Sequence, residues 1–429
     1  MSPIAIKSGQ ILHAMNTFVV DRIQTGGPGN LNIPTEKINE LGNYQSVATV
    51  RDVPDLTFSM DCLDVDTEVE GILAGSANPN ADPMGTDGVT GTKYSIAYPK
   101  PVDVVSPWKS AVGAFDIVRG AAIPHLALES INYRYGLREN AGETFSMRGD
   151  SIFYVPGQPY LMTAVGDGAR TAFAFNDDRA TTQPAARTAL IYSEQGEDLY
   201  ALNVSVDGVR QNRGLDYTET ATAVTFLTAP PTGARVRIVF GAAAGTTYPQ
   251  TVHQGTAVKP GAIRGKDIQV YVGDTVGDGT GAPLRWTDVQ AFNLTWQVTL
   301  EDDYEFGNPR SLARDATDVP AVSGSIDLKP ITTAALFVKL NQITGVDPTE
   351  IVGPQSSVTL PMEIRLLNPE SGGSSAQAKG AVLKTLYIPD ARFTVPGYEG
   401  RVQQKLVQTV NFESDTGILE IFKGRRFVA

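Results

Sequence analysis

The feature that most constrains this chain of 429 residues is a long internal repeat. Two blocks of the first half return in the second half: ELGN at Glu40–Asn43 and DVPDLTFSMD at Asp52–Asp61, against EFGN at Glu305–Asn308 and DVPAVSGSID at Asp318–Asp327. Matching positions are 265 or 266 residues apart, and the spacing of 265 still holds between Asp150 and Asp415. A spacing kept over so much sequence indicates a duplicated domain, because solenoid units repeat after far fewer residues.

The repeated blocks carry the pattern of half-buried β-strands. Apolar and polar residues alternate at Leu56–Cys62, Thr144–Met147, Val322–Leu328 and Val407–Phe412. Such alternation places the apolar side chains on one face of a strand. An earlier pair of segments, Ile6–Ile11 and Ile263–Ile268, matches with a spacing of 257, and an extra loop at Gly273–Gly281 in the second copy accounts for the difference. We therefore expect both copies to share their strands.

Each copy also predicts one helix after its first alternating strand. In the second copy the helix is expected at Thr332–Ile343, where Leu336, Leu340 and Ile343 recur at helical spacing behind a threonine cap. The counterpart in the first copy, Thr67–Ala74, is shorter and runs into a loop rich in Gly, Pro, Asn and Asp. The duplicated domain is thus mainly β with one short helix.

The segment between the copies has a different sequence pattern. It contains short alternating strands such as Leu202–Val206 and Ala234–Phe240, with a hairpin signal at Asp207-Gly208 and a turn at Ala229–Gly233. This pattern is typical of a small all-β sandwich inserted between the copies. The sequence predicts a first domain at residues 1–162, an inserted domain at 163–248 and a second copy at 249–429.

Composition narrows the classes of protein that fit. The net charge is −12 and the pI is near 4.8, which disfavours affinity for nucleic-acid backbones but allows a surface past which nucleic acid slides. The single cysteine, Cys62, allows no disulfide within the chain and is expected in a half-buried strand. Met1–Ile4 does not begin a secretory signal, and no apolar run is long enough to cross a bilayer.

The sequence offers no catalytic constellation. Its histidines, His13, His125 and His253, have no metal-ligand spacing, and neither a nucleophile elbow nor a phosphate-binding loop is present. The equivalent Asp150-Ser151 and Asp415-Thr416 lack the flanking residues of an aspartic protease, so we expect turns there. We expect no enzyme, no metal and no cofactor.

Two acidic runs, Asp61–Glu70 and Glu301–Glu305, lie near equivalent regions of the copies. Two interpretations fit them. They could form solvated faces, or they could form a charged surface at a lumen or between rings.

The repeated block, with its Asp-Val-Pro, alternating strand and capped helix, resembles the major tail tube protein of tailed bacteriophages. The resemblance covers both copies, and the inserted segment is similar to immunoglobulin-like β-sandwich modules of phage tail and fibre proteins. It implies a tube-domain β-sandwich or barrel with one flanking helix. That family usually has one tube domain per chain and six chains per ring. A chain with two such domains implies a trimeric ring with pseudo-sixfold symmetry.

The resemblance also implies roles and partners. Stacked rings would form a virion tail tube, assembled in the host cytoplasm, through which DNA passes without specific binding. The implied partners are further copies of this chain and the tape-measure, tail terminator and tail tip proteins, with no membrane involved. The residues implied at ring or stacking interfaces are Glu40, Asn43, Asp52, Pro54, Glu305, Asn308, Asp318 and Pro320.

Two other functions remain open at this stage. The chain could be a tail-hub, distal-tail or connector protein that makes one ring and does not stack. It could instead be a surface protein whose inserted sandwich binds host glycans, and the aromatic candidates there are Tyr192, Tyr200 and Tyr217. A hub would give single rings, a tube protein would polymerise, and a glycan binder would expose its aromatic side chains.

Overall fold

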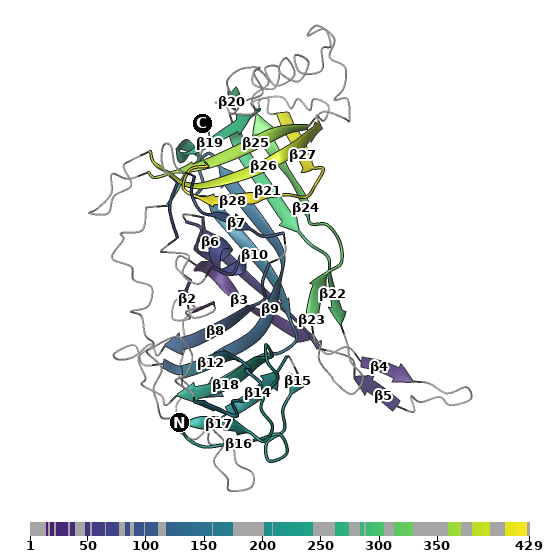
Figure 1. Ribbon diagram of the computed structural model, residues 1–429. Coiled ribbons are helices and arrows are strands. Elements are labelled where there is room, and N and C mark those ends of the chain that lie inside the picture. The colour runs from purple at the N-terminus through teal and green to yellow at the C-terminus, as the bar shows by residue number, and fades with distance from the viewer. Residues whose placement is uncertain are drawn as a thin grey trace, which may run out of the picture.

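The computed structural model is mainly β, built from antiparallel sheets (Figure 1). It describes residues 14–15, 18–20, 23–32, 35–38, 48–51, 54–64, 66–76, 82–85, 90–97, 99–109, 117–156, 158–174, 201–207, 209–242, 262–273, 284–286, 289–303, 313–328, 359–369, 380–394 and 408–426. Within these ranges there is one short α-helix, α1 (Glu68–Leu73), and one 3₁₀ turn, η3 (Gly265–Asp267). No described helix is long and apolar enough to span a membrane.

The strands of the first copy pair in a simple order. One sheet path runs through β3 (Ile23–Asn32), β6 (Asp55–Leu63), β10 (Gly142–Gly149) and β9 (Ile117–Gly136). The other end of β9 pairs with β11 (Phe153–Pro156) and β8 (Val102–Lys109), and β8 leads to β1 (Ala14–Met15) and β2 (Phe18–Val19).

The second copy repeats this order strand for strand. Its path runs through β21 (Val289–Gln297), β24 (Ala321–Leu328), β27 (Gln408–Ser414) and β26 (Val382–Thr394). The far end of β26 pairs with β28 (Glu420–Lys423) and β25 (Thr359–Leu367), followed by β19 (Ile268–Val272) and β20 (Leu284–Trp286). The repeat in sequence therefore corresponds to a repeat in strand pairing.

The register of the pairs fixes which residues are equivalent. Arg148 lies opposite Thr57 in the first copy, and Glu413 lies opposite Ser323 in the second. The spacing of 257 predicted for the first strand of each copy also appears, because Met15 and Val272 hold the same place in their sheets. The helix expected at Thr332–Ile343 lies outside the described residues, whereas α1 forms inside the segment predicted for the first copy.

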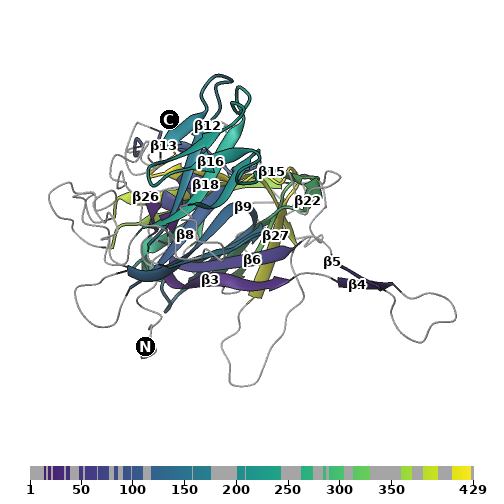
Figure 2. The same ribbon diagram turned by 90° about the horizontal axis from the view of Figure 1, so that it is seen from below.

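Two hairpins extend the repeated sheets. The first arm consists of β4 (Thr35–Ile38) and β5 (Ala48–Arg51), and the second arm of β22 (Leu300–Asp303) and β23 (Ala313–Ala316). Each arm follows the first strand of its sheet path and precedes the second, so the two arms are equivalent. Figures 1 and 2 show the first arm extending away from the sheets.

The inserted segment forms two small sheets around its own core. One contains β12 (Gln158–Val165), β18 (Arg235–Ala242), β14 (Ala201–Val206) and β15 (Val209–Arg210), and the other contains β13 (Ala172–Ala174), β17 (Ala223–Phe226) and β16 (Tyr217–Glu219). The two sheets share a buried cluster that includes Phe173, Phe226 and Phe240. The predicted hairpin forms at Asp207, whose φ of 49° is the left-handed conformation such turns need.

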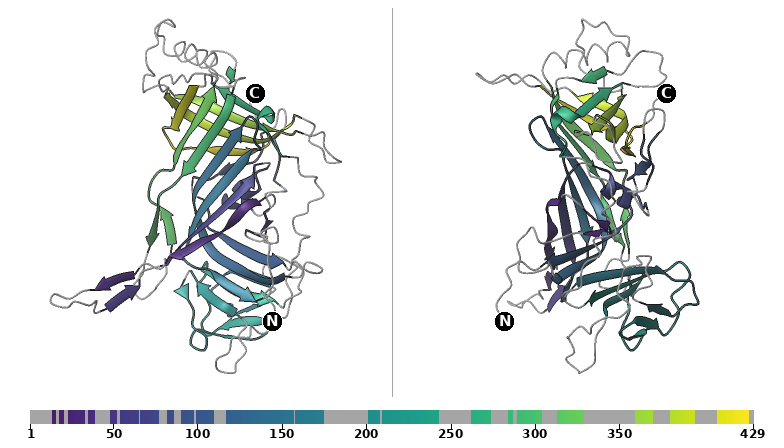
Figure 3. Two further views of the ribbon diagram at one scale, coloured as in Figure 1. Left: turned by 180° about the vertical axis from the view of Figure 1, so that it is seen from behind. Right: turned by 90° about the vertical axis from the view of Figure 1, so that its left-hand side faces the viewer.

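The inserted domain packs directly on the first copy. Leu161 and Val239 bury apolar surface against Ala122 of β9. Beside them Arg237 lies 2.7 Å from His125 Nδ1 and 3.7 Å from a carboxylate oxygen of Asp103. Burial and the charge of Arg237 lower the pKa of His125 to about 3, so the imidazole is neutral at physiological pH. Figures 2 and 3 show the inserted strands on the opposite side of the body from β3 and β6.

The two copies join through a shared sheet. Residues Ser130–Arg134 of β9 pair with β10 on one side and with β21 of the second copy on the other. The Asn132 side-chain amide donates to Thr295 Oγ1 across this junction at 2.9 Å. A second contact pairs β28 with β7 (Lys93–Ser95) of the first copy. The junction therefore combines main-chain hydrogen bonds with a common hydrophobic core.

A buried ionic cluster crosses the same junction. Lys384 Nζ of β26, fully buried, donates to Asp64 at 2.9 Å, to Glu143 at 3.0 Å and to Glu70 of α1. The hydroxyls of Tyr133 and Tyr135 donate to Glu70 and Asp64 at 2.9 and 2.5 Å. Every carboxylate and both tyrosines belong to the first copy, so the single lysine of the second copy links the two.

The charges in this cluster do not balance. Burial raises the pKa of Glu143 well above its usual range and that of Asp64 to about 6, and neighbouring carboxylates add to both shifts. Burial alone would lower the pKa of Lys384, but the surrounding carboxylates hold it well above its usual value. The ammonium is therefore charged at pH 7, and the site favours the protonated form of Glu143 more than water does.

The cluster corrects one interpretation of the acidic run Asp61–Glu70. We expected its carboxylates on a solvated, lumen or ring-to-ring surface, but Asp64, Glu68 and Glu70 are buried. Burial of Asp64 and Glu70 is possible because strand β26, distant in sequence, supplies a cation and the hydroxyls of β9 supply donors. Asp61, at the start of the run, does lie on an outward face.

Replacing Lys384 by methionine is expected to destabilise the chain by about 3 to 5 kcal/mol, because it leaves buried carboxylates without their cation. The measurement is urea unfolding. The matched control is Lys93→Met, which removes a lysine that is half exposed and also joins the copies, through Glu420. That control should cost less than about 1 kcal/mol. Equal effects of the two substitutions would contradict the role given to the cluster.

The cluster also predicts a pH dependence. The pKa of Asp64 is about 6 in the folded chain and about 4 in an unfolded one. Its protonation therefore favours folding below about pH 4, and this contribution is lost as the pH rises through about 6. Asp64→Asn keeps an acceptor for Lys384 but cannot titrate. Its unfolding free energy should rise relative to wild type between pH 4 and 6 and then level off. Parallel pH profiles would show that Asp64 titrates normally.

Candidate functional site

The shared sheet presents one continuous polar face. Along β6, β10, β9, β21, β24 and β27 every second side chain points away from the core. The strand register aligns these side chains in rows, and one row consists of Thr25, Asp61, Thr144, Asn132, Thr295, Ser323 and Glu413. The next row holds Arg134, Asn293, Ser325 and Asn411. We call this surface the polar face.

Small uncharged side chains dominate the polar face. Serine, threonine and asparagine occupy most of its positions, whereas the side chains between them, such as Phe145, Trp296 and Val410, are buried. Alternation of this kind gives a sheet one dry face and one wet face. The sequence pattern predicted the alternation in β6, β10, β24 and β27, but not in β9 or β21, and not that the strands of both copies would continue one another.

The arginines of the polar face are each paired with a carboxylate. Arg134 lies 3.4 Å from Asp61, and Arg148 lies 2.7 Å from Asp55. In the second copy Arg392 contacts Glu413 and Asp415, each at 2.8 Å. None of these guanidinium groups is left to form an isolated positive patch, which is the feature that phosphate backbones require.

Local hydrogen bonds shift the pKa values of two charged groups on this face. Burial would raise the pKa of Asp61, but hydrogen bonds from Thr144 and Thr25, both 2.5 Å long, and the nearby Arg134 outweigh it and lower the pKa. The hydrogen bond to Asp55 raises the pKa of Arg148 above its usual value. Both groups therefore remain ionised over the physiological pH range.

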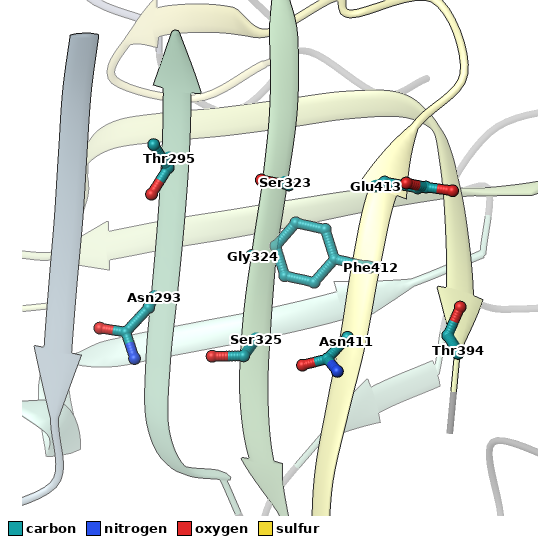
Figure 4. A pocket seen from close by; sticks show the side chains of 9 residues that line it. All are labelled: Asn293, Thr295, Ser323, Gly324, Ser325, Thr394, Asn411, Phe412 and Glu413. Atoms are coloured by element: carbon teal, nitrogen blue, oxygen red, sulfur yellow. The ribbon is translucent and has the colours of Figure 1, made fainter. Parts of the chain in front are cut away.

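The polar face is hollowed where β21, β24 and β27 lie side by side. The hollow has a volume of about 430 Å³ and is lined by Asn293, Thr295, Ser323, Gly324, Ser325, Thr394, Asn411, Phe412 and Glu413 (Figure 4). A side chain at Gly324 would collide with the Phe412 ring, so glycine lets the ring pack against the sheet. No described group of His, Cys, Asp or Glu could hold a metal ion here or elsewhere in the described chain.

The interface residues implied by the resemblance map to the arms and their ends. Glu40 and Asn43 lie in sequence between β4 and β5, and Glu305 and Asn308 between β22 and β23. Together with Asp52, these residues are outside the described part of the chain.

The remaining three sit where strands begin. Pro54 directly precedes β6, Pro320 directly precedes β24 and is buried, and Asp318 is exposed beside it. These prolines occupy the position where the missing N–H removes no ladder hydrogen bond. Pro54, Asp318 and Pro320 therefore lie near the strands that follow the two hairpins, and the polar face, which we had not singled out, is a separate surface.

Comparison with known proteins adds no relative. Neither the scan against protein-family models nor the search of curated proteins found a match.

Proposed function

We propose that this protein is the tail tube protein of a bacteriophage, in which trimeric rings with pseudo-sixfold symmetry stack into a hollow tube that conducts DNA. The observation that carries the proposal is the junction between β9 and β21, which merges the sheets of two equivalent domains into one. The sequence resemblance supplies the family, and the duplicated strand order supports it.

Repeating the internal junction between chains would close a ring. β21 pairs on both edges, with β24 and β9, whereas its equivalent β3 pairs only with β6 among the described strands. In the proposed ring, the second edge of β3 therefore pairs with the β26 side of a neighbouring chain. Closing all such edges into a barrel removes the exposed edges that otherwise promote aggregation.

The polar face then becomes the lining of the lumen. It is the outward face of the sheet that such a ring would continue, and the strands β3 and β6 of that sheet lie on the side of the body opposite the inserted domain (Figure 3). Its serine, threonine and asparagine side chains are uncharged, and its arginines are paired with carboxylates. DNA passing along such a lining would meet no positive patch that could hold its phosphates.

The alternatives are less well supported. A glycan-binding role needs exposed aromatic residues in the inserted domain, but Tyr217 is buried in its core against Phe226. Our interpretation of Tyr217 as a glycan-binding candidate was therefore wrong. Tyr192 and Tyr200 lie outside the described residues. A hub or connector ring uses the same junction, so it differs from a tube protein only in stacking.

Site-specific gold labelling tests the proposal. The sole cysteine, Cys62, is buried, and burial together with Glu143 raises the pKa of its thiol, so it should not react. Asn411→Cys on the polar face and Asp167→Cys on the exposed surface of the inserted domain each add one reactive thiol. After assembly and labelling with a maleimide gold cluster, particles are imaged by electron microscopy.

We expect threefold rings stacked into tubes, with gold inside for Asn411→Cys and outside for Asp167→Cys. Gold on the outer wall for Asn411→Cys would contradict the lumen assignment. Single rings that never stack at high concentration would favour the hub. A protein that stays monomeric under all assembly conditions would contradict the proposed function.

A further inference from the structure

The second arm is held on the first copy by an ion pair. Asp302 of β22 lies 3.4 Å from Arg148 of β10 and also pairs with Arg314 on the neighbouring strand β23. Asp302 and Arg314 are almost fully buried, with side-chain exposures of 7% and 2%. Their burial shows that the arm packs closely at this place, where β10 of the first copy ends.

The strand register identifies the counterparts of these residues. Lys37 holds in β4 the place that Asp302 holds in β22, because Lys37 lies opposite Thr49 and Asp302 opposite Arg314 at equivalent steps of the two hairpins. Glu413 holds in β27 the place of Arg148 in β10. Both members of the pair are therefore reversed in sign between the copies.

The strands of the two arms also differ in their charged residues. The strands of the second arm carry four acidic residues and one basic residue, whereas those of the first arm carry one acidic and two basic residues. Around Glu413 lie Asp415 and Asp390, and Arg392 is the nearby cation. This acidic surface is accessible in the single chain, since the Glu413 side chain is 56% exposed.

We propose that the first arm of each chain docks on the second copy of a neighbouring chain, with Lys37 against Glu413, as a charge-inverted version of the Asp302–Arg148 contact inside the chain. The inference rests on the proposed ring, and the internal junction supplies its geometry. The inference identifies the surface that each first arm binds on the neighbouring chain of the ring.

The inversion gives each arm one compatible surface. A first arm placed on the surface of Arg148 would bring Lys37 against a cation, and a second arm placed on the surface of Glu413 would bring Asp302 against an anion. Like charges in contact oppose binding and so exclude the wrong partner. An incoming chain is thereby directed to the free surface and cannot displace the arm that already holds the two copies together.

Charge reversal tests this contact in the full chain. Lys37→Glu and Glu413→Lys are each expected to raise the critical concentration for ring assembly at least about tenfold. The double variant should recover most of the wild-type value. Arg210→Glu reverses an exposed charge in the inserted domain and is the matched control, expected to leave assembly unchanged. Assembly is followed by sedimentation velocity, and unfolding curves show that each variant is folded.

The outcomes separate the two proposals. Single variants that assemble like wild type would overturn this inference while leaving the tube proposal intact. Two impaired single variants whose double variant is no better would also overturn the pairing of Lys37 with Glu413. A wild-type chain that never assembles would overturn the proposed function and this inference with it.

Discussion

The structure depends on the hydrogen bonds between β9 and β21. They convert two domains of equal strand order into one sheet, and they set the register in which polar side chains of both copies form common rows. The Lys384 cluster and the second arm reinforce this junction from the core side and from the end of β10. Because β9, β21 and the second arm each have an equivalent in the other copy, the fold contains within one chain the contact that an assembly would repeat.

Local sequence patterns predicted what neighbouring residues determine. The alternation in Leu56–Cys62 gave β6, and Asp207-Gly208 gave the hairpin between β14 and β15. Contacts between strands that are distant in sequence could not be predicted. Lys384 and Glu143 are 241 positions apart, and only the fold brings them together. The polar face could not be predicted for the same reason, since its rows appear only when the strands of both copies have a fixed register.

Charge is used in three different ways. In the core a single ammonium holds several carboxylates of the other copy, and burial raises the pKa of two of them. On the polar face each arginine is paired with a carboxylate, so small neutral side chains determine the polarity of that face. At the arms the sign of the charge differs between equivalent positions. The charged residues therefore have different structural roles in the core, on the polar face and at the arms, and the acidic net charge of the chain is only their sum.

The most direct test of the central claim is a cryo-electron microscopy reconstruction of the assembled protein at a resolution that separates strands. If the internal junction repeats between chains, β3 of one chain will pair along its second edge with the β26 side of its neighbour, in the register that β21 and β9 use within the chain. An assembly in which β3 remains an unpaired edge, or in which chains meet through the inserted domains, would contradict the account.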